Sequence, residues 1–442
     1  MGFLRCYLTV LLCMTSGMAA AMSLSEAFDR AVRHDPAIPQ SLAIYEAERA
    51  QSGAISGERK LRANAFGQFY RGRSEVESNF FLSGTEYGNQ QVIGVELRQP
   101  LFRRDWRALG RQARALDEQA ELGREDRIQR LVLRLADRYF GVLLEIESLE
   151  LALFEREALS KALEDTSNRV EVGVAAETDL RESRARYDLA RAAAMRAEVA
   201  LTSARAALHE ITNNGEADLP RLRPDMELPA LSPAGEDAWV DRARENSLVL
   251  LRARENVRLA EARLSSAKSA YSPTLDAVAL YRHDDTRDFP DGQDRRDSLV
   301  GLELQVPLYN GGMMRARSRE ASYLQQAAVA ELARLDLETE RRIRQLYREV
   351  EADRVQVDAL GVAVESALLA RVATRNGYEA GTRTILDVLD SESRVADARR
   401  NHAGARYGFL VNLLNLHYEA GVLTPDDIRG LDVLLDQDVS GA

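Results

Sequence analysis

The sequence predicts a mixed, mainly α-helical fold in which long antiparallel coiled-coil hairpins adjoin four β-strands. Two long stretches without proline, 101–219 and 308–424, carry apolar residues in steps of three and four, the spacing of a coiled-coil seam. Each stretch follows two shorter ones with the character of strands. This order of helices and strands occurs twice along the chain of 442 residues, which indicates an internal repeat.

Residues 1–21 have the layout of a secretory signal peptide. Arg5 precedes the apolar residues 8–14, and the alanines at 19–21 fit a cleavage site. The apolar run is too short to span a bilayer as a helix. Both cysteines lie here, so we expect no disulfide and no cysteine nucleophile in the mature chain. Removing the segment takes one basic and no acidic residue, and the formal charge moves from −11 to −12, which disfavours a nucleic-acid partner.

Four stretches are expected to form strands: 61–73, 92–101, 273–282 and 299–306. In the last of them Val300, Leu302 and Leu304 alternate with Gly301 and Glu303, so one face is apolar and the other polar. Such a strand suits a membrane barrel, with lipid outside and water inside. Taken alone, 92–101 would be interpreted as the edge strand of a soluble sheet. The polar stretches 74–90 and 283–297 are expected to be exposed loops, and Pro100 and Pro307 to end the strands before them.

Long helices are expected on both sides of two glycine-containing breaks. The first should run from about 105 to 169, roughly 100 Å at 1.5 Å per residue. Gly173 should end it, and a second helix should continue to about 211. In the second half a seam from 343 to 368 leads to Gly377 and Gly381, either of which can end a helix, and another helix should follow to about 419. Shorter helices are expected at 23–60, with an early break at Pro36 and Pro39, at 237–268, and after the capping residue Thr424.

The two halves match in sequence as well as in order. The segment GVELRQPLF begins at Gly94 and GLELQVPLY at Gly301, 207 residues later; the breaks at Glu171 and Glu379 are 208 residues apart and share the pattern Gly-x₅-Asp. We therefore divide the chain into a signal peptide, a first repeat, a proline-containing linker, a second repeat and a C-terminal segment, at 1–21, 22–212, 213–235, 236–420 and 421–442.

Four strands are too few to close a membrane barrel, for which about eight is the minimum. Open sheet edges are not tolerated in lipid, so several chains must contribute strands to one barrel. The long hairpins would then project away from the membrane, and their seams would pair between halves and between chains.

The chain closely resembles the TolC family of outer-membrane channel proteins. The most specific segments are GYEAGTRTILDVLD from Gly377, GLELQVPLYNGG from Gly301 and VGVAAETDL from Val172, and the resemblance covers essentially all of the mature chain. It implies a homotrimer in outer-membrane lipid, with a 12-stranded transmembrane β-barrel and an α-barrel tunnel across the periplasm. It also implies two partners, a periplasmic adaptor (membrane fusion) protein and an inner-membrane pump or ABC transporter, as in tripartite efflux or type I secretion.

The resemblance implies roles for residues at the two breaks. Asp387 and Asp390 are three apart, so on a helix they share one face. They match the aspartate pair that forms rings of carboxylates at the periplasmic constriction of the pore, where cations are attracted. A gate latch that holds this end closed is implied for four residues, the second half's Arg383 and Tyr378 bonding to the first half's Thr178 and Asp179.

Two other classes of protein are alternatives to a channel. A periplasmic coiled-coil adaptor or scaffold without a pore would share the long helices, but it predicts a lipidation site or inner-membrane anchor and one hairpin. A secreted enzyme is disfavoured because the five histidines are scattered without metal-ligand spacing, and there is no phosphate-binding loop or nucleophile elbow. We expect no catalytic residue, metal or cofactor. Small-molecule efflux and protein export both stay open as the cargo.

Overall fold

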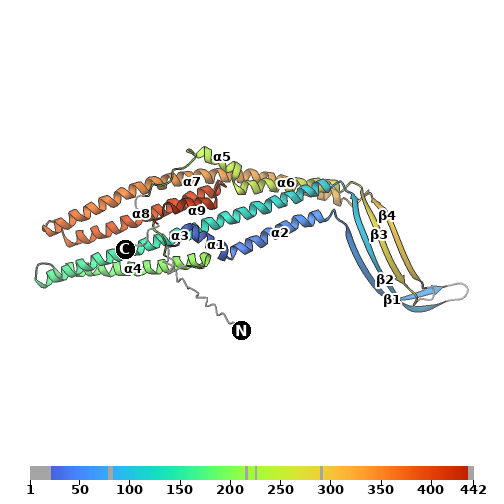
Figure 1. Ribbon diagram of the computed structural model, residues 1–442, viewed down its shortest axis with the longest axis horizontal. Coiled ribbons are helices and arrows are strands. Elements are labelled where there is room, and N and C mark those ends of the chain that lie inside the picture. The colour runs from blue at the N-terminus through green and yellow to red at the C-terminus, as the bar shows by residue number, and fades with distance from the viewer. Residues whose placement is uncertain (1–20, 78–82, 215–217, 224–225, 289–291, 437–442) are drawn as a thin grey trace, which may run out of the picture. The chain divides into compact units, whose positions relative to one another are not determined.

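The computed structural model describes residues 21–77, 83–214, 218–223, 226–288 and 292–436 (Figure 1). The predicted signal peptide lies outside this part of the chain except for its last residue. The elements in order are α1 (Leu24–His34), α2 (Ala37–Gly57), β1 (Arg62–Glu77), β2 (Ser83–Phe102), α3 (Trp106–Glu171), α4 (Glu177–Thr212), α5 (Glu236–Asn246), α6 (Leu248–Ser269), β3 (Thr274–Asp285), β4 (Asp294–Gln305), α7 (Met313–Glu379), α8 (Ile385–Glu419) and α9 (Pro425–Asp432).

The chain forms two compact units, and each contains segments from both sequence halves. One unit holds the hairpin ends, with Arg127–Ser247 and the chain from Glu340 onward joined by the segment up to Gln40. The other unit holds the strands, with Ser41–Asp126 and Leu248–Thr339. The long helices α3 and α7 pass through both units, so each sequence half supplies strands to one unit and a hairpin end to the other.

The strands form one antiparallel sheet in the order β1-β2-β3-β4, in which β2 and β3 join the two halves (Figure 1). The prediction of exposed loops at 74–90 and 283–297 is wrong over most of both stretches. β1 runs on to Glu77 and β2 begins at Ser83, while β3 reaches Asp285 and β4 begins at Asp294. Backbone pairing such as Arg73 with Tyr87 continues there whatever the polarity of the side chains.

Pro100 does not end its strand, contrary to the prediction. β2 continues to Phe102, and its pairing with β3 shifts in register between Pro100 and Phe102. An irregularity of this kind accommodates a residue that has no backbone N–H for the ladder. The matching strand β4 does end before Pro307, at Gln305.

The predicted apolar row of β4 is exposed. Val300, Leu302 and Leu304 have 87%, 70% and 65% of their surface accessible, so they are left largely uncovered by the described residues of this chain. The corresponding row of β2, Ile93 and Val95, is also exposed. Apolar rows left open on a sheet are what a lipid-facing surface requires.

The long helices form as predicted. α3 has 66 residues and α7 has 67, about 100 Å each at 1.5 Å per residue. Gly173, with φ of +76°, follows α3 in the left-handed conformation that glycine favours. Figure 1 shows α3 alongside α4 and α7 alongside α8. None of the helices in the described ranges has an apolar stretch long enough to cross a membrane.

One predicted helix is divided. The stretch 237–268 forms α5 and α6, which separate at Ser247, whose backbone N–H still donates to the Ala243 carbonyl. The division lies directly against Gly421, which has φ of +71°, and a Cβ built on Gly421 would fall 2.0 Å from the Asn246 carbonyl oxygen. α5 therefore ends at Ser247, where the turn after α8 approaches it.

The main apolar core lies in the unit with the hairpin ends. It joins α3 and α8 through Tyr139, Phe140, Tyr407 and Leu410, with the Phe140 and Tyr407 ring centroids 6.2 Å apart. Tyr139 is fully buried, and its hydroxyl donates to the Met22 carbonyl oxygen at 2.8 Å. This core fixes α8 against α3 some distance from the helix breaks, since α8 begins at Ile385.

Candidate gate at the helix breaks

The break between α7 and α8 is built by one glycine and a reciprocal helix cap. Gly381 has φ of +73°, so it is the residue that takes the left-handed conformation after α7. Thr384 caps α8, because its hydroxyl accepts from the Asp387 N–H at 3.2 Å while its own N–H donates to the Asp387 carboxylate at 2.9 Å. Both Thr382 and Thr384 precede α8, and the structure uses Thr384 as the cap.

Gly377 does not end the helix, although its sequence position allowed that interpretation. It lies inside α7, and its carbonyl accepts from the backbone N–H groups of Thr382 at 2.8 Å and Arg383 at 3.1 Å. A Cβ on Gly377 would lie 2.8 Å from Cγ of Arg383. The glycine is needed here because the returning chain folds closely over it.

Asp387 is held as an anion by the cap. Its pKa lies below the usual range because the backbone N–H of Thr384, and then the Thr384 hydroxyl, donate to the carboxylate. The positive end of the α8 dipole favours the same charge. Arg383 lies 4.0 Å away, Nη1 to Oδ1, and both side chains are largely exposed. Asp387 is therefore a partly exposed, ionised carboxylate at the start of α8.

Asp390 faces the other hairpin. Its carboxylate pairs with Arg186 of α4, with 2.9 Å between Oδ1 and Nη2. Arg186 also donates to Glu182 on its own helix at 3.3 Å. The two aspartates, although one helical turn apart, thus have different partners: Asp387 caps its own helix, and Asp390 ties α8 to α4.

Tyr378 contacts the end of α3. The guanidinium of Arg169 lies 4.8 Å from the centre of the Tyr378 ring, a cation–π contact between the two hairpins. Burial raises the pKa of the Tyr378 phenol, and the positive charge of Arg169 opposes this rise. Tyr378 is therefore a neutral phenol whose ring lies against Arg169.

Thr178 and Asp179 lie in the first turn of α4, where Asp179 complements the helix dipole. Within this chain, no hydrogen bond or ion pair joins Arg383 or Tyr378 to Thr178 or Asp179, four residues whose side chains are all described. The structure thus brings the two breaks together without forming the predicted bonds inside one copy of the chain.

A small apolar cluster lies beneath these polar contacts. Leu159 of α3 and Ala190 of α4 pack against Ile385, Val388 and Leu389 of α8, and Leu389 is fully buried. Sequence reasoning named the aspartates of this turn and missed its apolar side, which the spacing of Ile385, Val388 and Leu389 at i, i+3 and i+4 could have indicated. It also missed the cross-hairpin cations Arg169 and Arg186.

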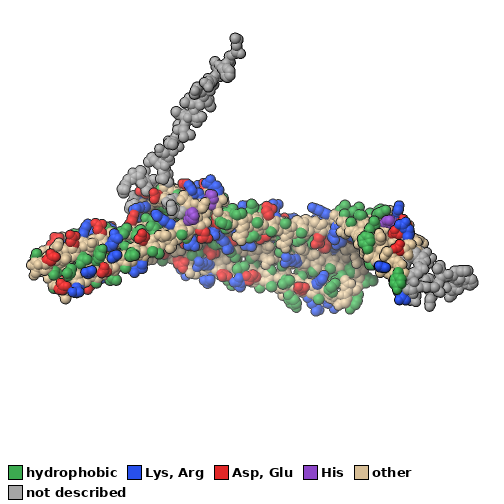
Figure 2. Space-filling view, turned by 90° about the horizontal axis from the view of Figure 1, so that it is seen from below, with side chains coloured by type: hydrophobic (Ala, Val, Ile, Leu, Met, Phe, Trp, Pro, Cys, Tyr) green, Lys and Arg blue, Asp and Glu red, His purple; other side chains and the backbone are tan. Residues whose placement is uncertain are grey.

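The side chains at the helix breaks form ion pairs and packing contacts. Within the part of the chain that the structure describes, no group of three or more His, Cys, Asp or Glu side chains is placed to hold a metal ion. Figure 2 shows acidic and basic side chains interspersed along the helical hairpins, so neither sign dominates this face. What the breaks provide is a set of ion pairs and caps that hold two helical hairpins in contact.

Comparisons with known proteins agree on one class. The sequence profile of the family described as "Outer membrane efflux protein" matches residues 28–214 and 239–421, once in each half. The chain therefore belongs to this family of outer-membrane channel proteins, which are not enzymes.

Among individual relatives, the chain is 29% identical to outer membrane protein TolC of Vibrio cholerae over 424 residues, 93% of each chain. It is also 29% identical to the proteases secretion protein PrtF of Dickeya chrysanthemi, over 96% of this chain and 93% of that protein. Its fold matches the crystal structure of outer membrane protein VceC of Vibrio cholerae with a TM-score of 0.75 at 16% identity, covering 90% of this chain and 96% of that one. The open state of the MtrE outer membrane channel of Neisseria gonorrhoeae matches with a TM-score of 0.70 at 19% identity, over 92% of each chain.

Proposed function

We propose that three copies of this chain form a channel that serves as the exit duct of an export machine. The observation that carries the proposal is the sheet. Its β4 row of Val300, Leu302 and Leu304 is open to solvent, and its outer strands β1 and β4 each have one unpaired edge. Three such sheets joined edge to edge give a closed barrel of 12 strands, which leaves no edge exposed to lipid.

The helical hairpins would then form the tunnel on the periplasmic side. α3, α4, α7 and α8 carry exposed apolar side chains away from the chain's own core, such as Leu189, Val199, Leu337 and Leu369. Neighbouring copies could cover these rows by coiled-coil packing, which offsets their exposure. The partners that we propose at the far end are a periplasmic adaptor and an inner-membrane pump or ABC transporter.

The cargo follows from these partners rather than from this chain. Relatives with comparable identity include a proteases secretion protein and the alkaline protease secretion protein AprF of Pseudomonas aeruginosa. We therefore propose export of proteins as well as small molecules, with the inner-membrane component choosing between them.

The helix breaks would form the periplasmic gate. Asp387 and Asp390 from three chains would place six carboxylates around the constriction, and such rings attract cations. Arg383 has 60% of its side chain exposed and no bond to Thr178 or Asp179 of its own chain. We propose that it bonds to these two residues of a neighbouring copy, as a charge-assisted latch that closes the ring of hairpins.

Ion selectivity tests the channel and its rings together. In a planar bilayer, the purified trimer should prefer cations, because the constriction carries fixed negative charge. The variant Asp387→Ala/Asp390→Ala should lose most of this preference, whereas Asp426→Ala, which removes an exposed acid on α9, should keep it. Equal cation preference in the double variant and the wild type would contradict the rings.

A further inference from the structure

We propose that the polar interface between α8 and the α3–α4 hairpin is a second lock, which holds the hairpins closed from a position behind the tips. It consists of two ties: Glu155 of α3 to Ser393 and Arg400 of α8, and Arg186 of α4 to Asp390 of α8. The inference rests on the proposed function, because a lock has meaning only where the hairpin ends can separate.

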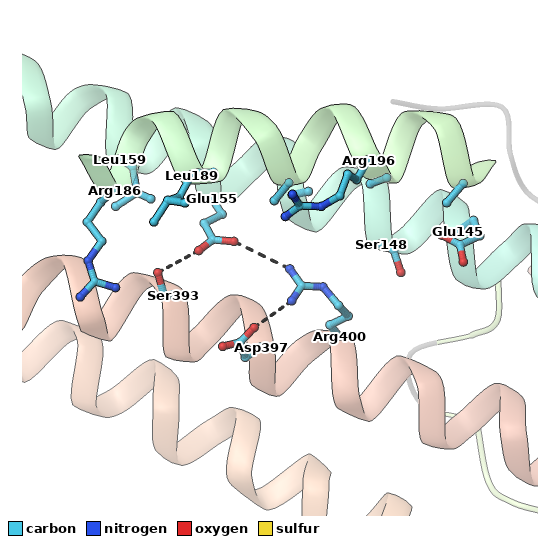
Figure 3. A pocket seen from close by; sticks show the side chains of 15 residues that line it. Glu145, Ser148, Glu155, Leu159, Arg186, Leu189, Arg196, Ser393, Asp397 and Arg400 are labelled. Carbon is cyan, nitrogen blue, oxygen red and sulfur yellow. Dashed lines mark hydrogen bonds and ion pairs between the residues drawn. The ribbon is translucent and has the colours of Figure 1, made fainter. Parts of the chain in front are cut away.

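Glu155 is the centre of the first tie. The Ser393 hydroxyl donates to its Oε1 at 2.8 Å, and Nη2 of Arg400 lies 3.7 Å from its Oε2 (Figure 3). Only 14% of the Glu155 side chain is exposed. Arg400 is oriented by Asp397, one turn before it on α8, at 2.8 Å. A half-enclosed carboxylate with two partners on the facing helix is a stronger attachment than an exposed ion pair.

The second tie lies nearer the helix break. Arg186 reaches across from α4 to Asp390 at 2.9 Å, and both side chains are partly exposed. The two ties use different helices of the first hairpin but the same helix, α8, of the second. α8 is therefore held on both α3 and α4 by charged side chains.

The interface between α8 and the α3–α4 hairpin contains a cavity beside these ties. A cavity of about 570 Å³ lies between α8 and the α3–α4 hairpin (Figure 3). Its lining on α4 includes the alanines Ala193, Ala197 and Ala200. Small side chains facing a cavity make few apolar contacts across it. The polar ties therefore join α8 to the first hairpin across this cavity.

The position of the ties indicates what they control. On one side lies the main core, where Phe140 and Tyr407 fix α8 against α3. On the other side lies the small tip cluster around Leu389. Between these two apolar contacts, α8 is bonded across the cavity by polar and charged side chains. When these bonds break, water can take the place of each partner. Once these bonds are released, only the small tip cluster would still have to part for α8 to swing about the core.

Single-channel recording of the purified trimer tests the lock. Glu155→Ala removes the hydrogen-bond acceptor of Ser393 and the ion-pair partner of Arg400. The fraction of time in the high-conductance state should therefore rise about tenfold or more, the ratio expected for losing one charge-assisted hydrogen bond. Glu157→Ala is the matched control, since Glu157 lies two residues away and its carboxylate is bonded to Lys161 on its own helix; it should behave as the wild type. Ser393→Ala removes a single oxygen and should give a smaller rise, which keeps the test open if Glu155→Ala does not fold.

The outcomes separate the lock from the channel itself. If Glu155→Ala and Ser393→Ala match the wild type while Arg383→Ser opens the channel, the lock is wrong and the proposed function stands. An equal rise in Glu157→Ala would also overturn the lock, because the effect would then be general to α3. If folded trimers of the wild type and Arg383→Ser both fail to conduct, the proposed function fails and the lock with it.

Discussion

At the scale of single residues, the two aspartates of the α8 start are not equivalent. Asp387 accepts from the Thr384 N–H at 2.9 Å and is kept ionised by its own helix cap. The carboxylate of Asp390 forms an ion pair with Arg186, a residue 204 positions earlier in the chain. A change at Arg186 would therefore alter Asp390 while leaving Asp387 unchanged, which makes the pair separable by mutation.

Glu147 is a second residue whose surroundings determine its charge. It lies on α3 beside the main core, where the Tyr407 hydroxyl lies 3.4 Å from its Oε2. Burial raises the pKa of Glu147 despite the opposing charge of Arg406. A raised pKa in the folded chain means that the ionised form is disfavoured by folding, so its cost is absent below the ordinary glutamate pKa and full above the raised one.

We predict that Glu147→Gln raises the unfolding temperature of the trimer at pH 7.5, because the amide imitates the neutral acid. The gain should shrink as the pH falls and disappear near pH 4, where wild-type Glu147 is itself protonated, about its ordinary pKa. Thermal melts followed by helical circular dichroism at several pH values would measure this. Glu157→Gln is the control with the opposite sign, since the hydrogen bond from Lys161 lowers the pKa of Glu157. A lower unfolding temperature for Glu147→Gln at pH 7.5 would contradict the prediction.

At the scale of elements, α8 has two kinds of contact with the first hairpin. Its start packs on Leu159 and Ala190 through a small apolar cluster, and its middle crosses a cavity on ion pairs. Within its own hairpin, buried Glu392 is flanked by Arg371 at 3.4 Å and Arg375 at 3.8 Å of α7. α8 is therefore bonded both to α7 of its own hairpin and to the first hairpin near the breaks.

Truncating the apolar cluster should loosen the start of α8. Leu389 is fully buried, and Leu389→Ala should cost about 2–5 kcal/mol of local stability, the range for a leucine lost from a core. Hydrogen exchange of the first turns of α8 would become faster, while α3 near Phe140 would stay protected. Leu386→Ala is the control, because Leu386 is 40% exposed three residues earlier. Equal exchange rates in both variants would show that the cluster does not hold α8.

The sequence predicted the helical elements better than the strand ends. Long seams and the left-handed glycines Gly173 and Gly381 are encoded locally, so the hairpins and their breaks could be placed. The outer parts of β3 and β4, 282–285 and 294–297, have polar sequences, and their backbones still pair with each other. Alternation of apolar residues cannot reveal such pairing, nor the break at Ser247, which lies against Gly421 far along the chain.

At the scale of the whole molecule, the candidate gate could be predicted only in part. The residues at the breaks were found from the sequence motif, and the structure places Tyr378 against Arg169 at the end of α3. The contacts of Arg169 and Arg186 were missed, because they join segments about two hundred residues apart without any local pattern. The aspartate rings and the Arg383 latch stay predictions, since both require neighbouring copies of the chain.

The division of the chain by sequence repeat differs from its division into compact units. The halves at 22–212 and 236–420 follow the sequence repeat, whereas the compact units cut across both halves. A duplicated chain whose halves share one sheet through β2 and β3 must fold with both halves present. The sequence repeat therefore shows which segments resemble each other, and the compact units show which segments pack together.

The most direct test of the central claim is the single-channel conductance of Arg383→Ser beside the wild type in a planar bilayer. The account predicts a small, cation-preferring conductance for the wild type and a clearly larger one for the variant, because the latch at the hairpin ends is lost. Arg181→Ser, which removes an exposed arginine paired with Glu177 on its own helix, should match the wild type. Equal conductance in Arg383→Ser and the wild type would contradict a gate held by Arg383.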